Sequence, residues 1–421
     1  MPTLRHLEDH VRQYGLKHKP LYAFSLVIFF FCVFDGILTY VTPLLLVQNG
    51  FSEATMGLII GSSSVAGALF DFFICRIFRK SDYRLIFMIL FVICTIYPLI
   101  LFKAQSAWIF LLAMGLWGIY YDLFNFGRFN FAGLNLKSSE HASGSGVLQV
   151  FRALGYLVAP LLAGMVVVET VNLQAFEFSW IFLGFGFLFF LLLLYMVRKQ
   201  HPKTPEQELC CRTVNLQKEF YLWAAASNLL RPVLIVTVLL CVFDSFFWTI
   251  GPLYAQSLHG VGGLSGLLLM AYEVPILGVG WCIGAITHKR GKKRTAFYSL
   301  GIGSALLLPL AFVTNPVLII GLVFCAAFFI SIATPSVNGA FTDYIAEAPT
   351  AEKEIVGIND FATNIGFVIG PIAAGLLAEN LGNGAAFAVL ALVSIGIVLI
   401  LLKTTPRHIG MSSLELAAET A

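Results

Sequence analysis

Apolar residues along this chain come in runs of about 20, separated by short polar or Gly/Pro-rich breaks. A helix needs about 20 residues to cross ~30 Å of hydrocarbon, so each run is long enough to span a bilayer. The pattern predicts twelve spanning helices. Their expected ranges are 22–47, 55–75, 85–102, 107–131, 143–167, 179–197, 232–256, 264–286, 295–313, 316–340, 355–378 and 383–402.

The composition agrees with this pattern. Hydrophobic residues make up 58% of the 421-residue chain, charged residues make up 12%, and the mean hydropathy is +0.86. Water-soluble domains contain about twice that share of charged residues. We therefore predict an all-α membrane protein, in which an even number of spans places both termini on one side of the bilayer.

The basic residues indicate which side that is. Of the 26 lysine and arginine residues, 23 lie in the segments that share a side with the N-terminus, and only Lys103 lies in a segment on the other side. Cytoplasmic loops are enriched in lysine and arginine. We predict that both termini are cytoplasmic and that the membrane is a bacterial inner (cell) membrane. The net charge of +3 is then a signal of topology and does not indicate nucleic-acid binding.

One long polar interval divides the spans into six and six, which predicts two domains. The expected organisation is a cytoplasmic segment at 1–20 with the spacing of an amphipathic helix, an N-terminal bundle at 21–197, a cytoplasmic linker at 198–231, a C-terminal bundle at 232–403 and a cytoplasmic tail at 404–421. The second part of the linker fits either an interfacial helix or a flexible loop.

The two halves repeat each other. The sequence Cys-Val-Phe-Asp ends at Asp35 and again at Asp244, an offset of 209 residues. A second repeat, with an offset of 211, pairs the fifth span with the eleventh. Its members are Gly146, Gly155, Pro160 and Gly164 in the first copy, and Gly357, Gly366, Pro371 and Gly375 in the second. Parallel repeats of six spans are one of the architectures that work by alternating access.

On these residues the chain resembles the major facilitator superfamily of secondary transporters, whose fifth span carries the pattern G-x8-G-x3-G-P-x2-G-G. In the first copy Ala159 and Ala163 replace two of the glycines, whereas the second copy keeps Gly370 and has Ala374. Small residues let helix backbones approach closely, and proline removes a backbone hydrogen bond. The resemblance implies twelve helices in two pseudo-symmetric six-helix bundles.

A second resemblance to that superfamily lies in the loops after the second and eighth spans, where the family pattern is G-x-L-x-D-R-x-G-R-K. Residues 284–293 follow it, with Lys289 and Gly291 in register and His288 where the acid is usual. After the second span only the opening matches, ending at Asp71. The resemblance implies that these loops clamp the halves together on the cytoplasmic side; the alternative is that they only enforce topology.

Ionisable side chains inside the spans are the candidates for function, because each costs on the order of 2.5 kcal/mol or more at the bilayer centre. At ~1.5 Å per residue, Asp244 and Glu273 fall near the midplane, with Asp35 slightly outward, and with Asp122 and Arg152 slightly inward. Burial disfavours a charged carboxylate and a nearby arginine favours it. We predict that the three first-named acids bind protons or substrate with Arg152 as counter-charge, whereas hydrogen bonds to neighbouring helices or an internal ion pair of Asp122 are the structural alternatives.

Aromatic and amide side chains near these charges are candidates for lining a cavity that accepts an aromatic or amphiphilic solute. They are Tyr40, Trp117, Tyr120, Tyr121, Asn125, Phe246, Trp248 and Tyr272. With 39 phenylalanines in the chain, most aromatic rings are expected to face lipid.

Other chemistry receives little support. All eight histidines lie outside the spans, which argues against an intramembrane metal or haem site, and the chain has no G-x4-G-K-[ST] nucleotide loop. We predict no disulfide, no cofactor and no enzymatic activity. The preferred hypothesis is a monomeric, proton-coupled exporter of a small organic solute; the alternative is proton-coupled uptake, and a membrane enzyme or lipid scramblase is third.

Overall fold

The computed structural model describes residues 19–78, 81–136, 141–167, 170–197, 216–258, 265–406 and 409–411. The predicted amphipathic N-terminal segment, most of the linker and most of the tail lie outside these residues. Every regular element in the described part of the chain is helical, and each of the twelve predicted spans is occupied by helix.

Six helices form the N-terminal bundle. They are α2 (Lys19–Gln48), α3 (Glu53–Ile77), α4 (Tyr83–Lys103), α5 (Ala107–Asn135), α6 (His141–Val166) and α7 (Leu173–Val197). Polar caps start several of them: Ser52 accepts a hydrogen bond from the Thr55 amide at the start of α3, and Asp82 accepts one from the Arg84 amide at the start of α4. Such caps satisfy backbone N–H groups that the first turn leaves free.

The C-terminal bundle repeats this arrangement. Its elements are α8 (Leu216–Thr249), α9 (Gly251–Ser257), α10 (Leu267–Arg290), α11 (Lys292–Leu307), η3 (Leu308–Ala311), α12 (Pro316–Glu347), η4 (Pro349–Ala351), α13 (Glu352–Leu381) and α14 (Asn383–Thr404). Only Gly291 separates α10 from α11, with a φ of 77° that favours glycine. The sharp change of direction after the eighth span therefore depends on a residue of the loop pattern.

α8 begins at Leu216, inside the range predicted as linker. Leu222, Ala226 and Leu230 are buried at intervals of four residues, which places them on one face of a helix. Packing along this face extends the seventh span as one continuous helix. An interval that is polar in composition is therefore helical because a sparse apolar stripe runs through it.

Ten helices in the described part of the chain are long and apolar enough to cross a membrane. α10 and α11 are not among them. The part of α10 whose side chains are described and apolar, Leu267–Val279, is too short to meet this criterion, and α11 is only 16 residues long before the chain continues in η3.

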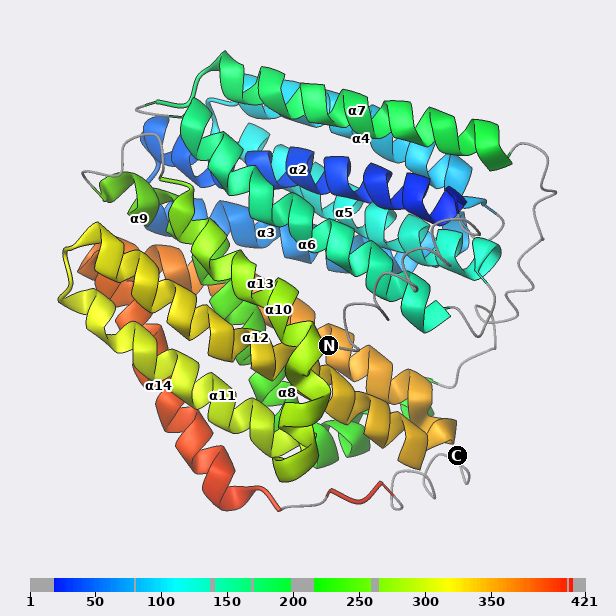
Figure 1. Cartoon of the computed structure of the whole chain (residues 1–421), viewed down its shortest axis with the longest axis vertical. Coiled ribbons are helices and arrows are strands. Elements are labelled where there is room, and N and C mark those ends of the chain that lie inside the picture. Colours follow the sequence, from blue (N-terminus) through cyan, green and yellow to red (C-terminus); the bar gives the residue numbers. More distant parts are fainter. Residues whose placement is uncertain are drawn as a thin grey trace, which may run out of the picture.

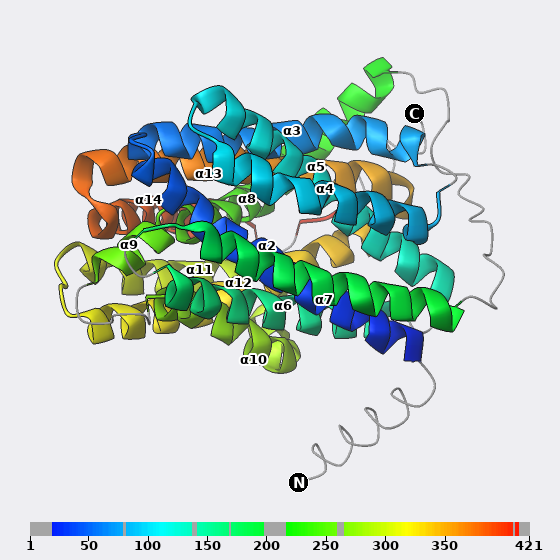
Figure 2. The same ribbon diagram turned by 90° about the horizontal axis from the view of Figure 1, so that it is seen from above.

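The two bundles lie one above the other in Figure 1, the N-terminal one coloured blue to green and the C-terminal one green to red. In the second view most helices of both bundles run in roughly the same direction (Figure 2). Between the bundles, α3 packs along α13 and α6 packs against α10. These contacts include the first turns of α3 and α10, so the halves meet at the face opposite the start of α2 and the end of α14. We call this the closed face.

Glycines of the repeated fifth and eleventh spans make equivalent contacts in the two halves. A Cβ atom on Gly155 would lie 2.6 Å from the Cβ of Cys32, and one on Gly366 would lie 2.5 Å from the Cβ of Cys241. The offsets of these two pairs are the 211 and 209 residues found in the sequence. The backbones of the first and fifth spans, and of the seventh and eleventh, therefore touch in the same way in both bundles.

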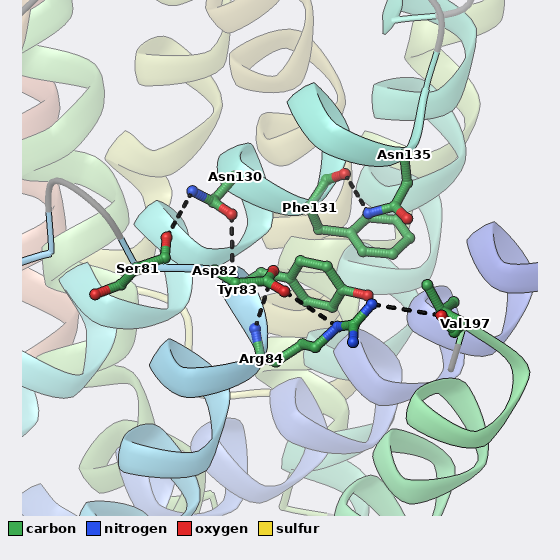
Figure 3. Close-up of polar contacts among 8 residues, drawn as sticks. All are labelled: Ser81, Asp82, Tyr83, Arg84, Asn130, Phe131, Asn135 and Val197. Carbon is green, nitrogen blue, oxygen red and sulfur yellow. Dashed lines mark hydrogen bonds and ion pairs between the residues drawn. The ribbon is translucent and has the colours of Figure 1, made fainter. Parts of the chain in front are cut away.

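Each bundle also has an equivalent polar corner at the start of its third helix. In the N-terminal bundle the Arg84 guanidinium donates to the Val197 carbonyl at the end of α7 (3.5 Å), as Figure 3 shows. In the C-terminal bundle the Lys293 ammonium donates to the Pro406 carbonyl beyond α14 (2.6 Å). Both pairs are offset by 209 residues. A basic side chain thus fixes the end of the last helix in each half.

The N-terminal corner contains a further link. The Tyr83 amide donates to Asn130 Oδ1 (2.9 Å), and the Asn130 amide group donates to the Ser81 carbonyl (3.4 Å). Figure 3 shows Asn130 reaching from α5 to the chain just before α4. The third, fourth and sixth helices of this bundle are joined at one end through these bonds.

Candidate functional site

Asp35 of α2 lies at the centre of the N-terminal bundle and receives three hydrogen bonds. Tyr120 donates to Oδ1 (2.6 Å), Tyr156 donates to Oδ2 (2.7 Å), and the Trp117 indole N–H donates to Oδ1 (3.1 Å). Only 1% of Asp35 is exposed. A buried carboxyl group is stable only when its hydrogen-bonding capacity is used, and α5 and α6 provide those partners.

Arg152 of α6 lies in the same region and is held by aromatic side chains. Its guanidinium donates to the Tyr121 hydroxyl and lies over two rings, 5.8 Å from the centroid of Tyr121 and 5.7 Å from that of Tyr156. Tyr121 itself stacks on Trp117, with centroids 5.3 Å apart. Because Arg152 and Tyr156 are one helical turn apart, α6 presents both to the centre.

The C-terminal bundle contributes two acids. Tyr272 of α10 donates to Asp244 Oδ1 of α8 (3.1 Å), and its ring stacks on Phe247 at a centroid distance of 3.9 Å. Glu273 follows Tyr272 on α10 and is buried, with 9% exposed. The Trp248 side chain lies beside it.

These groups form one site that both bundles share. Arg152 interacts electrostatically with Asp35, Asp244 and Glu273, which come from three different helices. The rings of Tyr156 and Trp248 meet across the two halves at 5.8 Å. The four predicted charged groups therefore lie within electrostatic reach of one another, although they come from four different helices of the two bundles.

Asp122 lies elsewhere. A Cβ atom added to Gly67 of α3 would lie 2.7 Å from Asp122 Oδ2, and this buried oxygen has no hydrogen-bond partner among the residues that the structure describes. Its electrostatic neighbour is Asp71, which in turn interacts with Asp360 of α13. Asp122 thus belongs to the α3–α5 contact and pairs with neither Arg128 nor Arg152.

The predicted cavity-lining residues divide in the same way. Trp117, Tyr121, Trp248 and Tyr272 belong to the central site. Tyr40 is fully buried and donates to the Ser265 hydroxyl (3.1 Å), a contact between the halves at the closed face. Asn125 is half-buried on α5, and none of the hydrogen bonds found among the described side chains involves it.

The glycines of the fifth and eleventh spans have unequal surroundings. Gly164 meets Gly266 across the halves, Gly375 meets Gly57 in the equivalent position, and Gly370 and Gly357 pack on Ser245 and Trp223 respectively. Gly146 is exposed and has no neighbouring atom within 4 Å of an added Cβ. The side chain of Lys289 lies outside the described residues.

Tyr156 is the principal residue of the site that the sequence reasoning missed. Among the described residues, it is the only side chain that bonds Asp35, lies under Arg152 and contacts a ring of the other half. Its position four residues after Arg152 and next to Gly155 was an available signal, since both place it on the inner face of α6.

No group of three or more His, Cys, Asp and Glu side chains among the described residues is arranged to hold a metal ion. The centre instead combines buried charges of both signs with aromatic rings, between two halves that contact each other at one face. A membrane protein with this fold and this site is a transporter of the two-bundle type.

Comparison with known proteins gives the family. Residues 24–353 match the model of the Major Facilitator Superfamily. The chain belongs to this superfamily and is an integral, multi-pass membrane protein. It is 23% identical over 374 residues to the uncharacterized MFS-type transporter YuxJ of Bacillus subtilis (strain 168), a match that covers 84% of this chain and 88% of YuxJ.

Solved structures show the same fold at low identity. A variant of the nucleoside transporter NupG has a TM-score of 0.75 at 14% identity and covers 92% of this chain and 100% of its own. The peptide transporter POT in complex with sulfate scores 0.70 at 12% identity, covering 92% and 94%. A bacterial homologue of the human lysosomal transporter Spinster, inward-facing and unoccupied, scores 0.67 at 14% identity, covering 95% and 96%.

Proposed function

We propose that this transporter moves a small organic solute by alternating access and that proton binding at the central site drives the movement. The observation that supports this most directly is that Arg152 lies within electrostatic reach of Asp35, Asp244 and Glu273, which come from both halves. Charges inside a membrane protein are costly and mark pathways for ions and substrates.

Coupling follows from the division of the site between the bundles. Burial favours the neutral form of a carboxylic acid, whereas a nearby arginine favours the carboxylate. Arg152 belongs to one bundle, and Asp244 and Glu273 belong to the other. Any tilt of one bundle against the other changes their separation, so the two acids take up a proton in one conformation and release it in the other.

The contacts between the halves support the assignment of this structure to one of the conformations of the transport cycle. All of the close glycine contacts between bundles lie at the closed face. With the termini in the cytoplasm, as the basic residues predict, this face is the outer one and the conformation is inward-facing. The Spinster homologue in its inward-facing form has the same fold.

Two directions of coupling remain, export by antiport and uptake by symport. The fifth-span glycine and proline pattern favours export, because the family associates it with antiporters. The central acids serve either direction equally well. Antiport and symport move protons in opposite directions relative to the solute, so one flux measurement separates them.

The experiment uses everted membrane vesicles and a pH-sensitive dye, with solutes chosen because they raise the unfolding temperature of the purified protein. For an exporter that exchanges solute for protons, adding solute outside the vesicles alkalinises the interior. Glu273→Gln and Asp244→Asn should abolish this signal. Glu177→Gln, a change at an exposed residue of α7, should not. A solute-driven pH change that persists in both site variants would refute the coupling.

A further inference from the structure

The charged groups at the centre that few hydrogen bonds occupy are of opposite sign in the two halves. On the N-terminal side, Asp35 is occupied by three donors from its own bundle, whereas the partners of Arg152 among the described residues are only the Tyr121 hydroxyl and two ring faces. Arg128 adds a second positive charge near Arg152 and donates to Gln149 (3.3 Å). The N-terminal half therefore presents a positive face.

The C-terminal half presents a negative face. Among the described side chains, Asp244 receives a single hydrogen bond, from Tyr272, and Glu273 lies close enough to Asp244 for their charges to interact. The positive and negative faces are within electrostatic reach of each other, yet Arg152 forms no ion pair with either acid in the described part of the chain. Opposite charges thus face one another across the two bundles without direct contact.

Aromatic rings lie beside the charged groups in both halves. Trp117 and Tyr121 stack in the N-terminal half, and Phe247 and Tyr272 stack in the C-terminal half. Apart from Phe247, these side chains are only half-buried, as are Arg152 and Asp244. The surroundings therefore offer flat apolar surfaces next to two charged groups of opposite sign.

We propose that the transported solute is a zwitterion with an aromatic or similarly planar apolar group, bound with its anionic end at Arg152 and its cationic end at Asp244 and Glu273. This assignment rests on the proposed transport function. A buried charge left without a partner is costly, so a solute that supplies both charges satisfies both faces. A purely cationic solute leaves Arg152 unpaired, and a purely anionic one leaves the acids unpaired. The cationic group also competes with the proton for the two carboxylates.

The test compares three probes that share a phenyl ring on a two-carbon chain: L-phenylalanine (zwitterion), 2-phenylethylamine (cation) and 3-phenylpropionate (anion). Binding is followed at pH 7 through tryptophan fluorescence of the purified full-length protein, because Trp117 and Trp248 lie in the site. Phenylalanine should bind at least about tenfold more tightly than either single-charge probe, the loss expected when a charged hydrogen bond cannot form.

Two variants test which residue binds each charged group of phenylalanine. Arg152→Gln should remove the preference for phenylalanine over phenylethylamine, and Glu273→Gln should remove the preference over phenylpropionate. Arg231→Gln and Glu177→Gln are matched changes at exposed residues and should leave both preferences intact. The unfolding midpoint of each variant shows whether it is folded, and the comparison of probes on the unmodified protein stands without the variants.

The outcomes separate this inference from the function on which it rests. Equal affinity for the three probes, or no binding of phenylalanine, overturns the zwitterion assignment even if other solutes drive proton flux. Tight, selective binding of phenylalanine supports the assignment. If that binding is accompanied by no proton movement in vesicles, the proton coupling fails while the solute class stands.

Discussion

At the scale of single residues, Tyr156 links the two charged parts of the site. Its hydroxyl group donates to Asp35, while its ring lies under Arg152 and meets Trp248 of the other bundle. A change in the position of the C-terminal bundle is therefore transmitted through one side chain to a buried carboxyl group. Tyr120 donates to the same acid but has no ring contact with the C-terminal bundle among the contacts described.

This difference gives a prediction. Tyr156→Phe and Tyr120→Phe each remove one donor to Asp35, and each should lower the free energy of unfolding by about 1.5–3 kcal/mol. Tyr156→Phe keeps the ring contact with Trp248, whereas Tyr156→Ala removes it. Transport should therefore be slower in Tyr156→Ala than in Tyr156→Phe. Thermal unfolding in detergent and vesicle flux measure the two effects. Full stability of Tyr156→Phe beside a destabilised Tyr120→Phe would show that the Tyr156 bond contributes nothing.

The sequence pointed to the charged residues of the candidate site, but it did not show which neighbouring side chains form hydrogen bonds and ring contacts with them. Asp35, Asp244, Glu273 and Arg152 stand out because an ionisable group is rare in an apolar run. Tyr156 does not, because a tyrosine in a span is as often placed at the lipid interface or in the core. Tyr40 shows the opposite case: its contact with Ser265 depends on which conformation the halves adopt, and a single span does not encode that.

At the scale of helices, the closed face depends on two crossings of equivalent geometry. A Cβ atom on Gly57 of α3 would collide with the Pro371 carbonyl oxygen of α13, and one on Gly266 would collide with the Pro160 carbonyl oxygen of α6. Gly57 and Gly266 are 209 residues apart, and Pro160 and Pro371 are 211 apart. Each proline of the repeat therefore packs against a glycine of the other bundle, and these two glycines are not part of the repeat pattern found in the sequence.

The crossings predict opposite effects for two changes of glycine to alanine. Gly57→Ala should separate α3 from α13 and lower the unfolding temperature, because backbone atoms cannot move aside as a flexible side chain can. Gly146→Ala should be neutral or stabilising by roughly 0.5–1 kcal/mol, since the site is open and alanine favours helix. Differential scanning fluorimetry of both variants measures the two unfolding temperatures. Equal stability would mean that the helices are not in contact at Gly57.

The helix boundaries show which features of the fold the hydrophobic pattern predicts and which it does not. The twelve apolar runs predicted the helices because a span must satisfy its backbone hydrogen bonds internally. The sequence left open whether the second part of the linker is helix or loop, because Leu222, Ala226 and Leu230 form only a sparse stripe within a polar segment, and α8 begins there. An amphipathic stripe of this kind predicts a helix but does not show whether the helix joins the following span.

At the scale of the whole molecule, the repeat in the sequence predicted the two bundles, but it could not predict their relative tilt. A transporter has at least two arrangements of the same helices, so the sequence is compatible with both. The structure gives one of them, in which α3 and α13 lie in contact at the closed face. The balance between arrangements depends on individual contacts between halves.

Glu379 makes one such contact, and it gives a final prediction. Its carboxylate, near the end of α13, accepts a hydrogen bond from the Ala54 amide (2.8 Å) in the first turn of α3. A negative charge at a helix N-terminus is favourable, and the bond exists only while the closed face is closed. Glu379→Ala should therefore destabilise this conformation relative to the one with the face open. Because Glu379 is exposed, water screens this contact, and we expect a shift in population of at most roughly fivefold.

Spin labels at Leu58→Cys and Leu381→Cys, exposed positions of α3 and α13 near this contact, would report the shift as a longer distance in pulsed electron–electron double resonance. They would be placed in a background in which the native cysteines are replaced, because Cys325 is exposed. Glu177→Gln lies on α7, away from the contact between α3 and α13, and should leave the distance distribution unchanged. An unchanged distribution in Glu379→Ala would mean that the glycine crossings hold the closed face without electrostatic help. In that case Gly57→Ala, and not Glu379→Ala, would be the variant that opens it.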